Sequence, residues 1–181
     1  IEYVKLPELD VCCGLPALHL GYRDDFQSLL NKNLKMLKNQ RIKLIITSCP
    51  SCYYIFKKHY PVEVKHMNEV ILENVEMLKR DYKNEEVTFF DPCNFGKDSE
   101  LYEQPREILK NVGFKLVELP FNREESLCCG FPLIDNSPKI ANHMAHQVLK
   151  DVKTKKLITN CPNCYEHLKK NSEIEVLDMC E

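Results

Sequence analysis

The cysteines of this 181-residue chain recur in a fixed order, and this recurrence constrains the fold more than any other feature. Cys12-Cys13-Gly14 matches Cys128-Cys129-Gly130, and in each case a Pro stands two residues after the Gly. A second block, residues 44–53, matches residues 156–165, and both blocks contain the motif Cys-Pro-x-Cys. A cysteine pair and a Cys-Pro-x-Cys motif with similar flanks, in the same order, indicate two copies of one unit.

The apolar pattern within each copy predicts alternating strands and helices. Short apolar runs rich in β-branched residues predict strands at 41–47, 87–90, 114–119, 156–159 and 174–177. Helical spacing, with prolines in first turns, predicts helices over 26–37, 51–59, 67–80, 105–112 and 138–149. Strands that alternate with helices favour parallel sheets. We therefore predict an α/β fold of two pseudo-repeated parallel-sheet lobes.

The two copies differ at their N-terminal ends. We expect residues 1–84 to form the first copy and residues 85–181 to form the second. The second copy opens with Asp91-Pro92-Cys93, and the equivalent of this segment in the first copy would precede Ile1. We therefore expect the first lobe to be truncated at its N-terminus, without its leading strand, helix and cysteine.

Composition excludes several classes of protein. The formal net charge is −2 and is spread along the chain, so no basic surface for nucleic acid is expected. No apolar run approaches the ~20 residues of a membrane span, and no secretory leader opens the chain. We expect a cytoplasmic protein, reaching a membrane only through partners, whose ten cysteines need a chemical explanation.

Three kinds of chemistry use cysteines in such numbers. Disulfides suit a secreted protein, which this sequence does not resemble. Dithiol exchange suits Cys-Pro-x-Cys at a helix N-terminus, where the thiol pKa falls, but it leaves the repeated cysteine pair without a role. Converging thiolates repel one another unless a cation lies between them, which favours a metal site. We favour metal and keep the other two readings as alternatives.

The two copies offer unequal sets of ligands. Apart from Cys180, the second copy has five cysteines, one more than tetrahedral zinc or a cubane [4Fe–4S] cluster uses: Cys93, Cys128, Cys129, Cys161 and Cys164. Such an excess includes a non-ligand or indicates a cluster of unusual geometry. The first copy has four cysteines, which would hold zinc, a cubane cluster or nothing: Cys12, Cys13, Cys49 and Cys52.

The second copy resembles the cysteine-rich CCG domain of the B-type and D-type proteins of heterodisulfide reductases and of related iron–sulfur subunits. The resemblance rests on Asp91-Pro92-Cys93, on residues 102–107, on residues 122–130 and on Cys161-Pro162-Asn163-Cys164. It implies two such domains in tandem. It also implies that Cys93, Cys128, Cys129, Cys161 and Cys164 bind a noncubane [4Fe–4S] cluster.

The resemblance implies a redox function in a complex. In heterodisulfide reductases such clusters take electrons and cleave the mixed disulfide of coenzymes M and B. The partners would be a ferredoxin-like iron–sulfur subunit and a flavoprotein subunit, and the substrate a disulfide or another small molecule. The alternative is an electron-relay or zinc/iron–sulfur interaction module of an anaerobic dehydrogenase for succinate, glycerol-phosphate, glycolate or lactate. No acid–base residue stands out, so none is named as catalytic.

A few further residues carry expectations of their own. Cys180 has no counterpart in the repeat and is expected to be a bystander. Lys97 either offsets the negative charge of the cluster or is an exposed lysine near a helix start. The histidines without repeat partners are expected to be solvated helix residues: His19, His59, His143, His146 and His167.

Overall fold

The structure is a computed structural model that describes residues 12–78, 82–99 and 101–181. These residues form two compact units, which are described separately below. The first unit consists of the described parts of residues 1–47 and 51–65, and the second of residues 48–50 and 66–181.

The described residues alternate between helices and strands along most of the chain. In order, the elements are α1 (Leu15–His19), α2 (Arg23–Asn39), β1 (Leu44–Thr47), α3 (Pro50–His59), β2 (Glu63–His66), α4 (Met67–Glu73), η2 (Val75–Met77), β3 (Glu86–Phe90), α5 (Cys93–Ser99), α6 (Glu103–Val112), β4 (Lys115–Leu116), η3 (Arg123–Glu125), η4 (Phe131–Leu133), α7 (Pro138–Leu149), β5 (Lys156–Thr159), α8 (Pro162–Lys170) and β6 (Glu175–Asp178). Within this part of the chain, no helix has both the length and the apolar character needed to cross a membrane.

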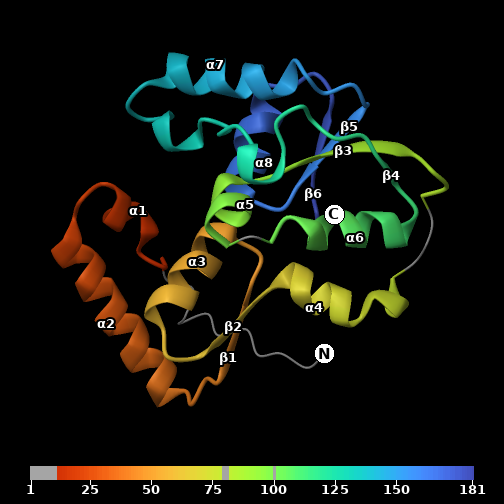
Figure 1. Cartoon of the computed structure of the whole chain (residues 1–181). Coiled ribbons are helices and arrows are strands. Elements are labelled where there is room, and N and C mark those ends of the chain that lie inside the picture. Colours follow the sequence, from red (N-terminus) through yellow and green to blue (C-terminus); the bar gives the residue numbers. More distant parts are fainter. Residues whose placement is uncertain (1–11, 79–81, 100) are drawn as a thin grey trace. The chain divides into compact units, whose positions relative to one another are not determined.

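The second unit is built on a parallel sheet with the strand order β4-β3-β5-β6. Phe89 of β3 lies opposite Ile158 of β5, and Leu157 of β5 lies opposite Val176 of β6. The fold is therefore α/β with parallel strands, as the sequence predicts. Figure 1 shows α7 and α8 on one side of this sheet and α6 on the other.

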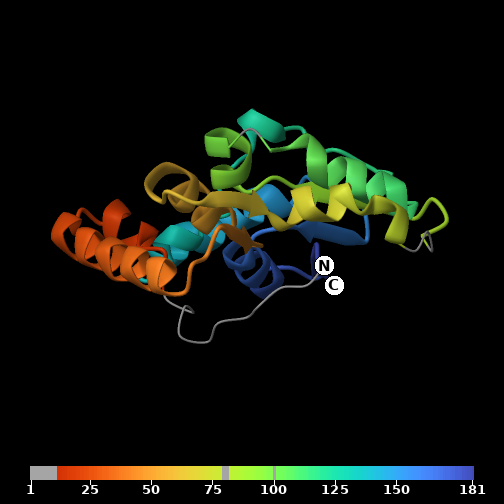
Figure 2. The same cartoon turned by 90° about the horizontal axis from the view of Figure 1, so that it is seen from below.

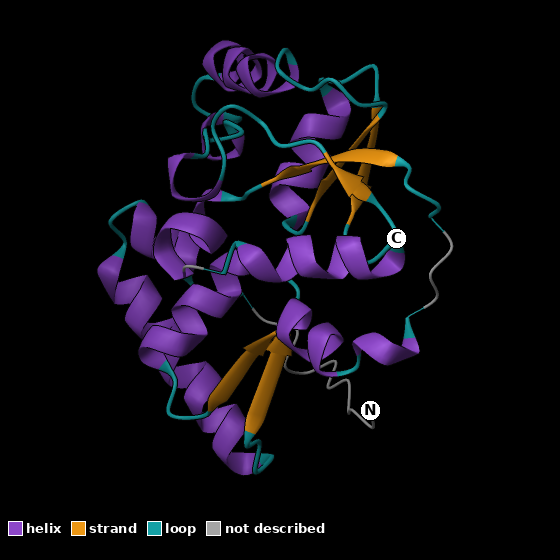
Figure 3. Ribbon diagram, turned by 45° about the vertical axis from the view of Figure 1, so that its right-hand side comes forward, coloured by secondary structure: helices purple, strands orange, loops and turns teal. Residues whose placement is uncertain are grey.

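Successive side chains of each strand point to opposite faces of this sheet, and both faces are buried. Phe90, Leu157 and Val176 face a core that includes residues of α7 and α8, such as Val148 and Leu168. The intervening residues face a second core against α6, formed by Val87, Phe89, Leu109, Phe114 and Ile158. Figure 3 shows the strands between these helices, so the fold presents the strand ends, rather than the faces, to a functional site.

Helix α4 packs against α6, and both belong to the second compact unit. The two helices run side by side in Figure 2. The sequence assigns α4 to the first repeat, because it precedes residue 85. The compact units of the structure need not coincide with the repeats of the sequence. The repeat boundary between residues 84 and 85 therefore stays a prediction.

The first unit has a two-stranded sheet, β1-β2, and a core formed by α1, α2 and α3. Leu30 and Leu37 of α2 and Ile55 of α3 are buried in this core. One backbone hydrogen bond recurs in both copies of the repeat. The N–H of Glu63 donates to the carbonyl of Lys43, and the N–H of Glu175 donates to that of Lys155, each at 3.1 Å.

Two expected elements are shorter in the structure, for local reasons. The strand predicted at 114–119 is only β4, and Pro120, which has no N–H, follows soon after its last ladder bond, from Val117 N to the Val87 carbonyl. The helix predicted at 67–80 ends at Glu73, where the Asn74 side chain donates to the carbonyl of Val70. Residues 79–80 of that prediction lie outside the described residues.

The turn that follows each cysteine pair needs a glycine. Gly14 and Gly130 have nearly the same left-handed backbone, with φ 92° and ψ −4° and −7°. Each donates its N–H to the first sulfur of its pair, Cys12 or Cys128, at 3.4 Å. The same sequence motif therefore makes the same local structure twice.

We expect Gly130→Ala to lower the free energy of unfolding by more than Gly21→Ala, measured by urea denaturation. Gly21 has φ +84° with no atom within 4 Å of an added Cβ, so its substitution costs only the left-handed strain of about 1–2 kcal/mol. An added Cβ at Gly130 would lie 2.5 Å from the carbonyl oxygen of Ala141, which is backbone and cannot swing aside. Equal losses for the two variants would contradict this account.

His66 is buried, 1% exposed, and joins β2 to α4. Its Nδ1 accepts from the N–H of Asn68, and Glu69 accepts from the N–H of His66, which completes a capping box. Its Nε2 lies 3.1 Å from the carbonyl oxygen of Ser48. Burial lowers the pKa of His66 from 6.5 to about 4, against the opposing effect of the Ser48 carbonyl.

We expect the free energy of unfolding to fall as the pH is lowered from 6.5 to about 4. In this range the unfolded chain binds a proton at His66 that the folded chain does not. The loss attributable to His66 should reach about 3 kcal/mol near pH 4. His66→Asn keeps a capping oxygen but cannot titrate, so its unfolding should depend less steeply on pH. An identical pH slope for both proteins would show that His66 is not the titrating group.

Candidate metal centre

The five cysteines of the second copy lie on segments that leave the carboxyl ends of β3 and β5 or pass nearby. Cys93 begins α5, directly after the turn that follows β3. Cys161 is the N-cap of α8, and Cys164 lies in the first turn of that helix. The pair Cys128-Cys129 lies between η3 and η4.

The fold aligns the two strand ends from which these segments leave. The hydroxyl of Thr159, the last residue of β5, donates to the carbonyl of Phe90, the last residue of β3, at 3.2 Å. Because the strands are parallel, both carboxyl ends lie at one edge of the sheet. Side chains far apart in the sequence are thereby brought together at that edge.

The five sulfurs form a continuous row of neighbours. Cys93 and Cys129 both lie close enough to Cys128 to lower the pKa of its thiol. The sulfurs of Cys129 and Cys164 are 3.3 Å apart, and Cys164 in turn contacts Cys161. The structure therefore brings together the whole set that the sequence singled out in the second copy.

Protons are shared unevenly along this row. Hydrogen bonds from Cys129 and Cys93 hold the pKa of Cys128 well below its usual range. A hydrogen bond from Cys164 lowers the pKa of Cys161. The pKa values of Cys93, Cys129 and Cys164 are raised, chiefly by the sulfurs that neighbour them in the row. Negative charge is therefore most favourable at Cys128 and Cys161.

Several nearby groups stabilise negative charge on Cys128 and Cys161. The N–H of Gly130 donates to Cys128, and the positive charge of Lys97 on α5 also lowers the pKa of Cys128. Backbone N–H groups of Asn163 and Cys164, at the start of α8, do the same for Cys161. Lys97 is exposed, as in the second of its expected roles, and its charge is the smallest of the effects that act on Cys128.

Two buried polar side chains beside the row have no hydrogen-bond partner. Asn160, directly before Cys161, is 3% exposed, and both its amide nitrogen and its amide oxygen are unsatisfied. Ser126, two residues before Cys128, is 1% exposed and has an unsatisfied hydroxyl. Such groups are costly unless something that is bound satisfies them.

The donor set fits a soft metal centre. Sulfur is the preferred donor of zinc and of iron–sulfur clusters, and unsatisfied N–H and O–H groups beside it can donate to the sulfur atoms of such a group. Within residues 12–78, 82–99 and 101–181, no three His, Cys, Asp or Glu side chains are placed so that they could together hold a metal ion. Metal binding would therefore require the sulfurs to rearrange as well as to lose the protons that link them.

All ten cysteines lie among the described residues, and none of them takes part in a disulfide. Cys180 is an exposed residue beyond β6, and partial burial and the neighbouring Asp178 raise its pKa to about 11. That Cys180 is a bystander stays a prediction.

Three cysteines of the first copy lie around Tyr60. Negative charge on Cys13, Cys52 or Cys12 raises the pKa of Tyr60, although burial is the larger cause. The side-chain amide of Asn33 donates to the Tyr60 hydroxyl at 2.8 Å and to the Cys12 carbonyl at 3.1 Å. The fourth residue, Cys49, belongs to the second compact unit, where its charge raises the pKa of Cys161.

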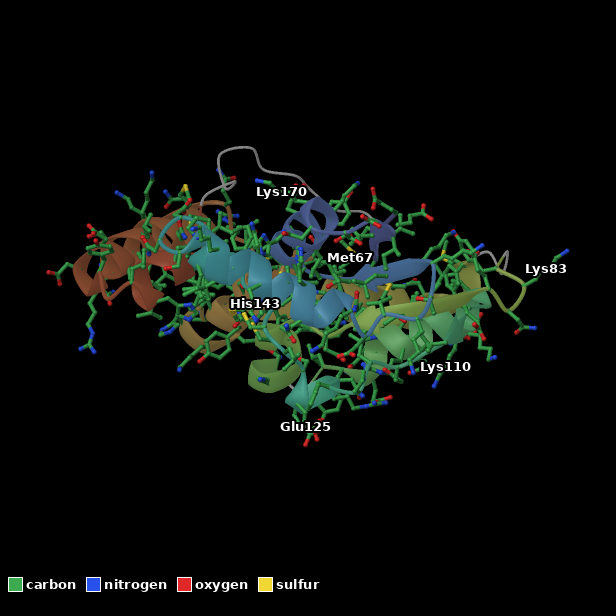
Figure 4. The ribbon with its side chains drawn as sticks, turned by 90° about the horizontal axis from the view of Figure 1, so that it is seen from above. Met67, Lys83, Lys110, Glu125, His143 and Lys170 are labelled. Carbon is green, nitrogen blue, oxygen red and sulfur yellow. The ribbon has the colours of Figure 1, made fainter. Side chains whose placement is uncertain are left out.

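The histidines divide between solvent and core. His19, His143 and His146 are exposed, as expected, and Figure 4 marks His143 on α7. His167 is buried, 2% exposed, with Nε2 3.1 Å from the carbonyl oxygen of Ala141, so the expectation that it is solvated is wrong. His59 is half-buried against the ring of Phe26. Leu168, the next residue of α8, is also buried, so this side of the helix faces the core.

Sequence reasoning missed Asn160 and Ser126. The repeat contains a signal for the first, because a small polar residue also precedes the other Cys-Pro-x-Cys motif, at Ser48. No local pattern distinguishes Ser126, because its burial depends on tertiary packing.

The matching family is the cysteine-rich domain family CCG, whose sequence profile covers residues 1–57 and 87–169. An uncharacterized iron-sulfur protein of Methanocaldococcus jannaschii is 33% identical over 92% of this chain and 35% of its own length. One component of the fumarate reductase (CoM/CoB) of Methanothermobacter marburgensis is 29% identical over 96% of this chain and 37% of its own length. One component of the dihydromethanophenazine:CoB–CoM heterodisulfide reductase of Methanosarcina barkeri is 26% identical over 100% of this chain and 50% of its own length.

The chain thus spans half or less of the length of these relatives. The profile match covers both copies of the cysteine motif and leaves out residues 58–86 between them. The resemblance seen in the sequence is confirmed: this chain belongs to the CCG cysteine-rich domain family.

Proposed function

We propose that this chain is the cysteine-rich part of an iron–sulfur oxidoreductase subunit of the heterodisulfide reductase type. Cys93, Cys128, Cys129, Cys161 and Cys164 hold one [4Fe–4S] cluster, and five ligands favour the noncubane form. The observation that carries the proposal is the row of five neighbouring sulfurs, two of them with lowered pKa values, beside the unsatisfied Asn160. The names of the relatives support an iron–sulfur group over zinc.

The reaction would be the reduction of a disulfide to two thiols, which consumes two electrons and two protons. The bound cluster supplies one-electron transfer at its sulfur-ligated iron. The electrons come from a ferredoxin-like partner subunit or, through it, from a flavoprotein. The chain's own residues keep the ligands together: the N–H of Gly130 and the charge of Lys97 stabilise negative charge at Cys128.

The first-copy cysteines form a second, incomplete site in this proposal. Cys12, Cys13 and Cys52 lie around Tyr60, whereas Cys49 acts on Cys161. Such a set would hold zinc or a cubane cluster, or stay without metal. Electron transfer and disulfide reduction are assigned to the second copy alone.

A second candidate function is an electron relay that does not itself bind a substrate. One relative is named for fumarate reduction and another for heterodisulfide reduction, so the shared cysteine-rich part serves different overall reactions. The apolar hollow between Phe90, Leu119, Phe121 and Leu127 is lined by none of the five cysteines. A relay needs the cluster and a partner but no substrate pocket at the cluster.

We expect Cys128→Ser and Cys161→Ser each to lose most of the iron that the wild-type protein binds after anaerobic reconstitution. These two residues have lowered pKa values, which favours the thiolate that binds metal, and serine is a poor ligand for iron–sulfur clusters. Iron and sulfide analysis, together with the visible absorption of the cluster, measures the loss. Cys180→Ser is the matched control and should keep its iron, because that thiol lies outside the row.

Retention of full iron and absorption by Cys128→Ser and Cys161→Ser would contradict the proposed ligand set. Cys52→Ser separates the proposal from dithiol exchange. The cluster proposal expects this variant to keep the iron of the second copy, whereas an exchange mechanism expects loss of activity without loss of metal.

Turnover separates reductase from relay. The reconstituted protein, given a reduced dye as electron donor, should reduce a mixed disulfide if it is a reductase. A protein with a full cluster that accepts electrons but releases no thiol would favour the relay.

A further inference from the structure

Arg106 of α6 is the centre of a buried ionic network beside the cysteine row. The residue is 1% exposed, and its guanidinium lies 5.4 Å from the centre of the Phe89 ring. It pairs with both oxygens of Asp91, at 2.8 and 2.7 Å, and with both oxygens of Glu118, at 2.8 and 2.9 Å. A further bond goes to the carbonyl of Tyr102, so all five N–H donors of the guanidinium are used.

Asp91 connects this network to the Cys93 segment. It stands directly before Pro92-Cys93 and is 1% exposed. Both of its oxygens are held by the planar guanidinium, which fixes the carboxylate in position and direction. Pro92 adds a fixed φ to the single residue between Asp91 and Cys93. The turn that carries Cys93 therefore has little freedom as long as Arg106 is in place.

Asp91 also connects the network to the segment that leads to Cys128. Its Oδ2 accepts a hydrogen bond of 2.8 Å from the N–H of Arg123, the first residue of η3. Arg123 has φ +55°, a left-handed conformation that is uncommon for a residue other than glycine. Its carbonyl lies so close to α5 that a Cβ on Gly96 would approach it to 2.8 Å. The Asp91 carboxylate thus joins the segment that carries Cys93 to the segment that leads to Cys128.

The other three cysteines have a different kind of support. Cys129, Cys161 and Cys164 are themselves part of the apolar core between the sheet and α7 and α8. Cys93 and Cys128 are not among the buried residues of that core and are only half-buried. Packing therefore positions three sulfurs, and a charged network adjoins the segments that carry the other two.

We propose that Arg106, acting through Asp91, positions Cys93 against Cys128 and so completes the five-sulfur set. Arg106 is a positioning residue, because it touches no sulfur itself. The inference rests on the proposed function only where it concerns cluster binding. The placement of Cys93 against Cys128 is a property of the protein without metal. A lysine at residue 106 would keep the charge but lack the planar fork that holds two carboxylates at once.

The test is the alkylation rate of each cysteine in the reduced, metal-free protein, resolved by mass spectrometry of its peptides. In Arg106→Lys we expect Cys93 and Cys128 to react about tenfold faster or more, because a broken buried ion pair loosens the segments it held. Cys161 and Cys164 should react at the wild-type rate. Asp91→Asn, which keeps the size of the side chain and removes its charge, should give the same pattern if Arg106→Lys does not fold.

Lys115→Gln is the matched control. It breaks the exposed ion pair of 2.7 Å between Lys115 and Glu86, at the β3–β4 edge of the same sheet, where the side chains are 64% and 54% exposed. We expect it to leave all five rates unchanged. After reconstitution, Arg106→Lys should release iron to a chelator more readily, corresponding to about 10- to 100-fold weaker binding, the usual cost of losing an outer-shell partner.

Two results would overturn the positioning role. One is unchanged rates at Cys93 and Cys128 in folded Arg106→Lys and Asp91→Asn. The other is an equal increase at all five cysteines, which would mean that Arg106 only stabilises the fold. A wild-type protein that binds no iron, with the selective alkylation pattern still present in the variants, would refute the proposed function and leave the positioning role standing.

Discussion

Five sulfurs in hydrogen-bonding contact cannot all be ionised at once, and this constraint dominates the second unit of the protein. The pKa is lowered at Cys128 and Cys161 and raised at the other three sulfurs, so negative charge is most favourable at these two positions. Each further thiolate would repel its neighbours in a partly buried site. A positively charged group that takes the place of the shared protons removes that repulsion, and this is why the row is suited to bind metal.

Two features of the fold bring cysteines that are far apart in the sequence to one place. Parallel strands deliver Cys93 and Cys161 to the same edge of the sheet, and the Thr159–Phe90 hydrogen bond keeps their strand ends level. The apolar core then holds the three most buried cysteines, while the Arg106 network adjoins the segments that bear Cys93 and Cys128. Because the segments that bear Cys93 and Cys128 are held separately, these two sulfurs can be set at a distance from each other that core packing alone would not fix.

The fold was largely predictable from sequence because its signals are local. The strand at 156–159 and the helix beginning at Pro138 are found where the apolar pattern and the proline place them. The expected strand at 114–119 is shorter, because Pro120 limits the ladder and Glu118 turns its side chain to Arg106. The repeat motif likewise predicts the paired glycine turns at Gly14 and Gly130.

The candidate site was predictable in its ligands but not in its surroundings. Cysteine spacing alone singled out the five sulfurs, which the structure brings together. The ionic network could not be predicted, because Arg106 meets Asp91 and Glu118 across 15 and 12 residues of sequence. The burial of His167 and Asn160 is also a tertiary effect, since both residue types are commonly exposed.

The most direct test of the central claim is the metal content of the wild-type protein prepared and reconstituted without oxygen. Iron, inorganic sulfide and zinc would be measured per chain, together with the visible absorption spectrum. The account expects a coloured protein with iron and sulfide in equal amounts, about four of each for the second copy. A colourless protein that holds zinc and no iron would contradict it.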